Sequence, residues 1–186
     1  MHSIHLQQAV RHLNAGNIIA YPTEAVWGLG CDPFNELAVL GLLQIKRRPV
    51  SKGMILIAGD MARIAPWLEA LTPAQRRRLD ETWPGPVTWL LPDPHELAPP
   101  WIRGAHDKVA IRVSAHPLVE ALCRKFGGPV VSTSANRAGR APARNRLQLA
   151  AQLNGCMDFI VPGALGRQQQ PSAIRDIETG EWIRGG

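Results

Sequence analysis

Apolar residues recur along this 186-residue chain at two alternating spacings, that of an α-helix and that of a β-strand. The helical spacing predicts helices over residues 4–15, 33–46, 73–82, 117–126 and 147–153. The strand spacing predicts strands over residues 17–21, 54–58, 87–91, 109–113, 129–132, 159–161 and 181–183. Such alternation from end to end is typical of a mixed α/β domain, in which helices cover a sheet.

The second predicted helix has a clear start signal and an apolar repeat. Asp32 followed by Pro33 is a favourable pair for the N-cap and the first helical turn, so we expect the helix to begin there. The spacing of Leu37, Leu40 and Leu43 then predicts that these three side chains point toward the core.

The chain is expected to form one domain over residues 1–186. A domain of this length buries roughly two thirds of the surface that its unfolded chain exposes, so its core needs no covalent support. The sequence contains no internal repeat, low-complexity tract or linker. Hydrophobic residues make up 45% of it, which is ordinary for a globular protein and excludes a disordered chain.

Membrane and export signals are missing from the sequence pattern. No apolar run approaches the roughly 18 residues that a membrane span requires. Residues 1–16 are amphipathic and lack the basic-then-apolar order of a signal peptide. The sequence therefore predicts a cytoplasmic protein that does not enter a membrane.

Cysteine and histidine are too scattered to suggest a framework or a metal centre. Cys31, Cys123 and Cys156 are far apart and form no C-x-x-C pair, and the six histidines include no H-E-x-x-H. We expect the thiols to be small, partly buried side chains. Neither a disulfide framework nor a metal site built by the protein is predicted.

Basic residues outnumber acidic ones and give a formal net charge of +6. They gather at residues 46–48, 76–78 and 137–146. An excess of this sign favours phosphate-rich partners, either a nucleotide or RNA. The cluster at 76–78 falls in a predicted helix, where a solvated face is explanation enough.

Familiar nucleotide-binding motifs do not account for this charge. The sequence has no G-x-x-x-x-G-K-[ST] and therefore no P-loop. Gly28 and Gly30 supply only G-x-G, and Pro33 stands where the third glycine of a dinucleotide fingerprint belongs. These glycines more simply indicate a tight backbone path beside a pocket.

Polar segments follow two of the predicted strands. Residues 21–24 (Tyr-Pro-Thr-Glu) follow the first, and residues 132–136 (Ser-Thr-Ser-Ala-Asn) follow the strand near residue 130. Open α/β sheets bind their ligands at the ends of strands. Hydroxyls, an amide and free backbone N–H groups in the second segment could form an anion-binding concavity there.

Two cations end the second predicted helix. Lys46 and Arg48 precede Pro49, which prevents the helix from continuing. The helix dipole favours cations at that end by roughly 0.3 to 1 kcal/mol, and this alone could explain them. A phosphate site shared with residues 132–136 is the alternative explanation.

Six segments, read in order, resemble one known family over essentially the whole chain. They are Pro-Thr-Glu-Ala-Val-Trp-Gly-Leu-Gly (22–30), Lys-Arg-Arg-Pro-Val-Ser-Lys (46–52), Trp-Pro-Gly-Pro-Val-Thr (83–88), Ala-Ile-Arg-Val (110–113), Ser-Thr-Ser-Ala-Asn (132–136) and Pro-Ser-Ala-Ile-Arg-Asp (171–176). This order is similar to that of the YrdC/TsaC family of L-threonylcarbamoyladenylate synthases, in its short bacterial form. The resemblance implies a YrdC/RibB-like fold: a three-layer domain with an open, twisted mixed sheet between helices and a basic concave pocket.

The resemblance also implies a reaction and its participants. L-threonine, bicarbonate and ATP would give threonylcarbamoyl-AMP and pyrophosphate, with Mg²⁺ arriving on ATP. The product would serve the threonylcarbamoyladenosine modification of tRNA, through the TsaB, TsaD and TsaE proteins. Positioning and charge neutralisation, rather than a covalent nucleophile, drive such a phosphoryl displacement.

Site residues follow from the matching positions. For the nucleotide, the resemblance implies Lys46, Arg48, Lys52, Ser132, Ser134 and Asn136, with Lys46 and Arg48 as the catalytic cations. For threonine, it implies Thr23, Arg112 and Ser172, with Arg112 pairing with the carboxylate.

Some positions leave alternatives or depart from the family pattern. Arg112 could instead be a buried strand arginine with a local acid partner, and Ser172 a simple loop hydroxyl. Gly53 stands where many members have proline, and Ala173 and Arg175 differ from the usual Ser-Thr-Ile-Val-Asp. These departures concern the details of threonine contact.

Two other functions fit parts of the sequence. The same basic surface could bind double-stranded RNA or ribosomal precursors through shape and phosphate contacts. A pure RNA surface, however, has no need of Thr23, Ser134 and Asn136 at strand ends. The domain also resembles a part of carbamoyl-transferring hydrogenase-maturation proteins, which contain acylphosphatase and zinc-finger parts that have no counterpart here.

Overall fold

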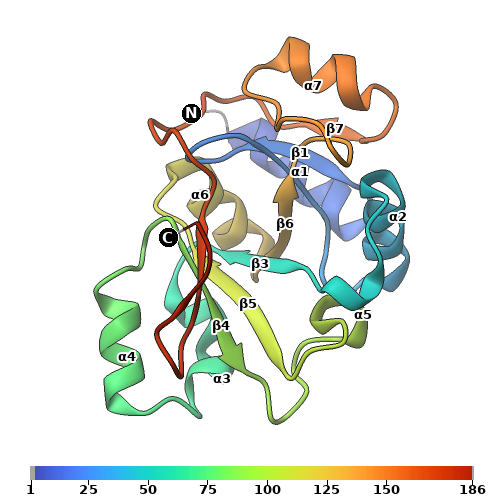
Figure 1. Ribbon diagram of the computed structural model, residues 1–186. Helices are drawn as coiled ribbons and strands as arrows, with labels where there is room; N and C mark the ends of the chain where they lie inside the picture. The colour runs from blue at the N-terminus through green and yellow to red at the C-terminus, as the bar shows by residue number, and fades with distance from the viewer. Residues whose placement is uncertain (1–2, 186) are drawn as a thin grey trace.

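A mixed sheet of nine strands runs through the computed structural model, which describes residues 3–185 of the chain (Figure 1). Its strands are β1 (Ile19–Pro22), β2 (Trp27–Gly30), β3 (Ile55–Ala58), β4 (Val87–Pro92), β5 (Lys108–Val113), β6 (Val130–Ser134), β7 (Phe159–Ile160), β8 (Ala173–Asp176) and β9 (Trp182–Arg184). The spatial order is β7-β1-β2-β6-β3-β5-β4-β8-β9. Pairs β1–β7, β3–β5 and β4–β8 are parallel and the other five are antiparallel.

Helices lie on both faces of the sheet and confirm the predicted mixed α/β fold. They are α1 (Ser3–Asn14), α2 (Glu36–Lys46), α3 (Ala65–Leu68), α4 (Pro73–Asp80), α5 (Pro100–Arg103), α6 (Pro117–Phe126) and α7 (Arg146–Leu153), with short 3-10 helices η1 (Val50–Lys52) and η2 (Met61–Ile64). Helices α1 and α6 pack together over one face, and the other helices join the apolar cluster of the opposite face. The domain was predicted over 1–186, of which residues 1, 2 and 186 lie outside the described part.

Alternation along β1 shows how the strands serve both layers. Ile19 and Tyr21 pack into the cluster under α1 and α6, whereas Ile18 and Ala20 pack into the cluster of the opposite face. This is the period of two that a strand buried on both faces requires.

Helices α1 and α6 cover only one half of their face of the sheet. No helix within residues 3–185 covers the other half. Val130 and its cross-strand partner Ile57 are buried beneath these helices. Ser132 and Ser134 follow Val130 at steps of two on β6, so they lie on the same face, beyond the helices. The uncovered half of the face is where the site forms.

The start and the buried stripe of α2 differ from the prediction. Asn35, not Asp32, is the N-cap, and its side chain accepts from the N–H of Ala38. Leu43 is buried as expected, but Leu37 is 81% exposed. The helix sequence is apolar on nearly every side, so residue spacing alone could not decide which side faces the core.

Strands β2 and β8 and helices α3 and α5 were not predicted from the sequence. Strand β2 was missed because glycines occupy two of its four positions. A Cβ on Gly30 would lie 2.4 Å from the carbonyl oxygen of Val131 and 2.8 Å from the ring of Tyr21. Glycine is therefore required for the close approach of β2 to β6, as the tight path predicted for this segment implies.

The remaining expectations concern cysteines and membranes. Cys31 and Cys123 are buried free thiols and Cys156 is a partly buried one, as predicted. Burial raises the pKa of Cys31 and of Cys123 to about 12, so both stay protonated at neutral pH. Within residues 3–185, no helix is long and apolar enough to cross a bilayer.

Candidate active site

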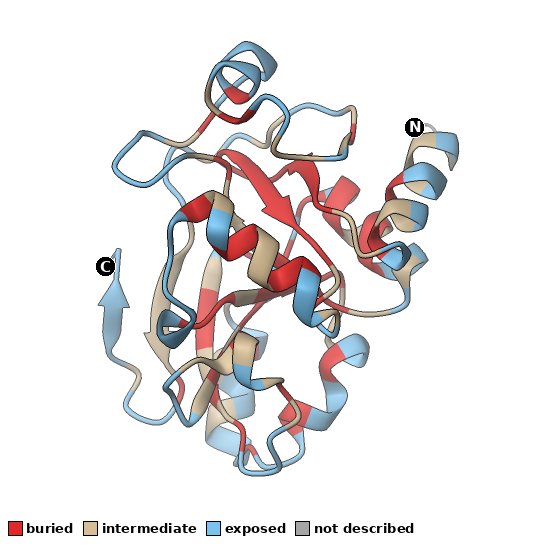
Figure 2. Cartoon of the chain, turned by 90° about the vertical axis from the view of Figure 1, so that its right-hand side faces the viewer, coloured by how far each residue is buried: buried red, intermediate tan, exposed pale blue. Residues whose placement is uncertain are grey.

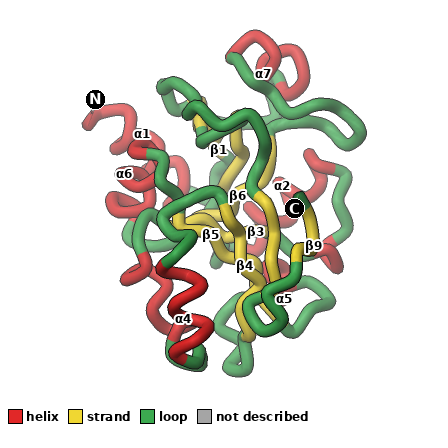
Figure 3. The backbone as a smooth tube through the Cα atoms, turned by 60° about the vertical axis from the view of Figure 1, so that its left-hand side comes forward, coloured by secondary structure: helices red, strands yellow, loops and turns green. Residues whose placement is uncertain are grey.

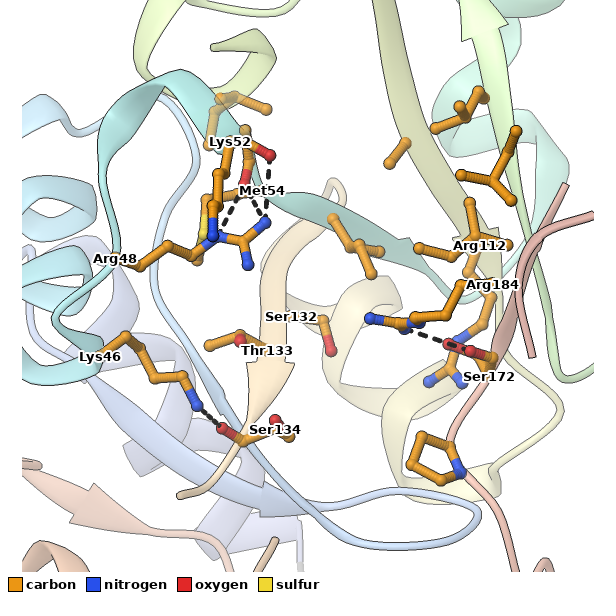
Figure 4. A pocket seen from close by; sticks show the side chains of 18 of the residues that line it. Lys46, Arg48, Lys52, Met54, Arg112, Ser132, Thr133, Ser134, Ser172 and Arg184 are labelled. Carbon is orange, nitrogen blue, oxygen red and sulfur yellow. Dashed lines mark hydrogen bonds between the residues drawn. The ribbon is translucent and has the colours of Figure 1, made fainter. Parts of the chain in front are cut away.

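A cavity of about 800 Å³ occupies the uncovered half of the sheet face. Strands β3, β5 and β6 supply its floor, the end of α2 with η1 supplies one wall, and the hairpin of β8 and β9 supplies the opposite wall (Figure 4). All nine residues that the sequence singled out line this cavity: Thr23, Lys46, Arg48, Lys52, Arg112, Ser132, Ser134, Asn136 and Ser172. The structure thus brings the two predicted groups into one space.

The position of the cavity corrects one expectation. The predicted strand ended at residue 132, so Ser134 was expected to follow it, but β6 extends to Ser134. The site consequently lies on a face of the sheet rather than beyond the ends of its strands. Polar side chains fit there because no helix covers that half of the face.

Lys46, at the end of α2, makes three hydrogen bonds to Ser134 and Asn136. Its Nζ donates to the carbonyl oxygens of Ser134 and Asn136 and to Asn136 Oδ1, the latter two at 2.8 Å. An ammonium has three donors, so all of them are used within the protein. Only the protonated form of Lys46 can serve all three acceptors.

The amide of Asn136 is engaged at both ends. Its Oδ1 also accepts from Ser134 Oγ at 2.6 Å, and its Nδ2 donates to the carbonyls of Arg137 and Arg140. Lys46, Ser134 and Asn136 therefore form a rigid turn at the cavity mouth. Their contribution to an anion site comes from charge and from the shape of this turn.

Arg48 and Lys52 leave donors open toward the cavity. Arg48 uses Nε and Nη2 to bind the carbonyls of Lys52 and Gly53, and its Nη1 donates to no residue of the described chain (Figure 4). The Lys52 ammonium likewise makes no hydrogen bond within residues 3–185. These two cations can reach an anion without breaking an existing contact.

Electrostatics in the cavity favour an anionic ligand. Burial, and then the nearby charge of Arg48, lowers the pKa of Lys46 to about 8. Burial, and then the charge of Arg184 on β9, lowers the pKa of Arg48. Cations that destabilise one another in this way are stabilised when an anion lies among them.

Arg112 makes the local ion pair that the sequence left open as an alternative. It is 6% exposed, and its Nη2 lies 3.1 Å from Oε2 of Glu24. Oε1 of Glu24 accepts from Ser114 Oγ at 2.6 Å. The guanidinium nevertheless lines the cavity and has further N–H donors. The ion pair therefore fixes the position of the side chain and leaves donors available to a ligand.

Three hydroxyls that line the cavity are held at defined positions. Thr23 Oγ1 donates to the carbonyl of Val26 at 2.8 Å. Ser172 Oγ accepts from Thr88 Oγ1 at 3.2 Å, and Ser132 lies beside Tyr21. The cavity therefore has one end with cations around Arg48 and another where Thr23 and Ser172 lie with Arg112. Arg184 connects the two ends, because it donates to the Ser172 carbonyl and its charge lowers the pKa of Arg48.

Two contributors were missed by sequence reasoning. Glu24 lies in the segment 22–30 but received no role, although its acid beside Thr23 was a usable signal. Arg184 is in the last strand, and its Nη2 donates to the carbonyl of Ser172. Nothing in its sequence context indicates that β9 folds back over the cavity.

Within residues 3–185, no cluster of three or more His, Cys, Asp or Glu side chains could hold a metal ion. Asp176 and Glu178 line the cavity but both bind Lys108, with 2.7 Å between Lys108 Nζ and Asp176 Oδ2. Cations and neutral polar groups thus dominate the chemistry of the site.

The sequence of this domain matches the model of a known protein family. The family model for Sua5, YciO and YrdC proteins, described as "Telomere recombination", covers residues 11–186. The chain belongs to this family.

Relatives within the family match nearly the whole of this chain. The chain is 53% identical to the threonylcarbamoyl-AMP synthase of Cellvibrio japonicus over 176 residues, which is 95% of this chain and 93% of that protein. Two solved structures of P. abyssi Sua5 also resemble it. One, of a H234A/Y235A variant, has a TM-score of 0.86 at 28% identity over 96% of this chain; the other, complexed with L-threonine, has 0.85 at 27% over 92%. The chain spans about half of those Sua5 chains, 54% and 50%.

Proposed function

We propose that this protein makes threonylcarbamoyl-AMP and pyrophosphate from L-threonine, bicarbonate and ATP. The observation that carries the proposal is a single cavity with a cationic end and a hydroxyl-and-arginine end. One end suits a polyphosphate and the other a small amino acid. The name of the Cellvibrio japonicus relative and the L-threonine complex of P. abyssi Sua5 support the same substrates.

The proposed chemistry requires orientation more than covalent catalysis. The threonine amine and bicarbonate form a carbamate and release water. A carbamate oxygen then attacks the α-phosphorus; the new O–P bond forms as the α–β bridging bond breaks, and pyrophosphate leaves with the electron pair. Negative charge grows on the leaving group, so cations placed beside it stabilise the transition state.

At the nucleotide end we assign the phosphate contacts to Arg48 and Lys52, whose donors are open. Ser132 completes this end from the cavity floor. Lys46 is a positioning residue there: it holds the Ser134 and Asn136 turn and adds a buried positive charge. The predicted catalytic pair is thereby divided into one contacting and one positioning cation.

At the threonine end we assign the carboxylate to Arg112. Thr23 and Ser172, which flank it, would bind the amino acid's polar groups. The ion pair between Arg112 Nη2 and Glu24 Oε2 keeps the guanidinium from turning away. The remaining donors can form the bidentate contact that arginine makes with carboxylates.

The proposal also includes the source of magnesium and the proteins that receive the product. Mg²⁺ would enter as the magnesium complex of ATP, because Asp176 and Glu178 are already bound to Lys108. The product would pass to the TsaB, TsaD and TsaE proteins for tRNA modification in the cytoplasm. Contact with RNA through the arginines of residues 137–146 is part of this proposal.

Pyrophosphate release tests the proposal directly. We expect release only when ATP, threonine and bicarbonate are all present. Lys46→Ala should remove most of it, whereas Lys125→Ala should not, because Lys125 is an exposed lysine that also ends a helix but lies outside the cavity. Release that does not depend on threonine would contradict the substrate assignment, and full activity of Lys46→Ala would contradict the site.

A further inference from the structure

Arg175 lies between two indole rings, one in the core and one on the last strand. Its Cζ is 4.7 Å from the centroid of Trp89, which is fully buried on β4. On the other side it is 4.6 Å from the centroid of Trp182 on β9, which is 51% exposed. A planar guanidinium can stack on both rings at once. Arg175 therefore connects β9 to the interior.

The same side chain also holds the turn that precedes β9. Arg175 Nε and Nη2 donate to the carbonyl oxygen of Gly180 at 3.1 and 2.8 Å. Gly180 has a φ of +77° and is part of the turn between β8 and β9. One guanidinium thus contacts both the turn and the outer strand of this hairpin. The turn is also held by Arg78, whose Nη1 donates to the carbonyl of Ile177 at 2.6 Å, and by Lys108, which pairs with Glu178.

Strand β9 and the residue before it also make hydrogen bonds to β8 and to Ser172: Arg184 Nη2 donates to the Ser172 carbonyl, and the Asp176 N–H donates to the carbonyl of Glu181. The strand is at the edge of the sheet beside the C-terminus (Figure 3), and all three of its residues are exposed (Figure 2). It pairs only with β8, and that pairing is irregular between Ile174 and Arg175. An edge strand with so little buried surface is weakly stabilised by its own contacts.

This strand nevertheless supplies one wall of the cavity. Ile183 and Arg184 line the cavity, and Arg184 reaches into it from β9 (Figure 4). Ile174 and Asp176, the neighbours of Arg175 on β8, line the cavity as well. Arg175 pairs in register with Trp89 and so faces the opposite side of the sheet, away from any ligand.

We propose that Arg175 is a positioning residue that sets the β8–β9 hairpin as a wall of the anion-binding cavity and presents Arg184 to the phosphates of ATP. The identity of the anion rests on the proposed function. The positioning itself rests on the stacking and on the Gly180 contact. Arg175 acts through Arg184 and touches no substrate.

A double-mutant cycle separates positioning from general damage. Arg175→Met should raise the dissociation constant for magnesium ATP about tenfold, measured by calorimetry. In an Arg184→Met background the same substitution should have an effect of less than about twofold, because the group it positions is gone. Arg124→Met, on the exposed face of α6, is the matched control and should bind like the wild type.

Hydrogen exchange tests the hairpin without reference to the function. Amides of residues 181–184 should exchange about tenfold faster in Arg175→Met than in the wild type, while those of β3 and β5 stay unchanged. Unchanged exchange at 181–184, or equal losses of ATP affinity in both backgrounds, would overturn the inference. If the wild type did not bind ATP, the proposed function would fail, and exchange would still decide the role of Arg175.

Discussion

Raising the pH through the pKa of Lys46 should weaken ATP binding. This lysine is 8% exposed and its pKa is lowered to about 8, first by burial and then by Arg48. The phosphates of ATP would favour the charged ammonium and raise that pKa again. Above pH 8 the free protein has lost a proton that the complex needs, so binding must take one up.

The free-energy difference between the two protonation states of Lys46 follows from the lowering of its pKa. A pKa lowered from 10.5 to about 8 corresponds to about 3 kcal/mol between the two protonation states. Lys46 is charged in the folded and unfolded chain below pH 8, where its burial destabilises the fold most. Between about pH 8 and 10.5 the unfolded chain binds more protons, so the free energy of unfolding from this group rises with pH.

The hydrogen bonds of Lys46 also predict weaker ATP binding when this lysine loses its proton. A neutral amine has two donors, but Lys46 serves three oxygens, so deprotonation leaves one acceptor of the Ser134 and Asn136 turn unpaired. Loss of the proton thus removes a positive charge and loosens the turn together. Both changes reduce affinity for a triphosphate.

Calorimetric titration with magnesium ATP from about pH 7 to 9.5 measures the effect. The dissociation constant should stay level below pH 8 and then rise by up to about tenfold per pH unit. Proton uptake should appear as a dependence on the ionisation enthalpy of the buffer. Lys46→Arg keeps its charge over this range and should show no such rise. A wild-type constant that changed less than about twofold, or an equal rise in Lys46→Arg, would refute the reasoning.

Two further predictions concern the threonine end and the strand packing. Glu24→Gln should lower the free energy of unfolding by about 3 kcal/mol, because Arg112 loses its buried counter-charge. Threonine should stabilise this variant against urea more than it stabilises the wild type, and equal stabilisation would argue against carboxylate binding at Arg112. Gly30→Ala should lower the free energy of unfolding by about 2 kcal/mol, since its Cβ meets backbone at 2.4 Å. Gly128→Ala, whose Cβ meets nothing within 4 Å, is the control in the same urea assay, and equal losses would contradict the packing argument.

Most helices and strands were predictable because their patterns are local. The helix over 117–126 has a proline at its first position and a strong apolar stripe, and α6 has those bounds. Strand β2 was not predictable, because Gly30 is required by the close approach of β6, which lies about a hundred residues further along the chain. Strand β9 was predicted, but its place beside the cavity depends on pairing with β8, which was not.

In the candidate site, too, the residues were predictable from the sequence, whereas their contacts were not. Its nine predicted residues were found through family segments, and the structure places them around one cavity. Their division of labour could not come from sequence. That Lys46 and Asn136 satisfy each other, while Arg48 has an open edge, depends on the tertiary approach of α2 to β6. Hydrogen-bond saturation is a property of the fold and leaves no trace in residue spacing.

The uncovered half-face of the sheet also explains how one small domain can hold two substrates at fixed relative positions. The floor is rigid, because its strands are central in the sheet and their opposite face is packed into the apolar core. All three residues of β9, the outer strand of the β8–β9 wall, are exposed, as are the residues of η1 in the opposite wall. A rigid floor fixes the phosphates and the carboxylate relative to each other, which the in-line displacement needs.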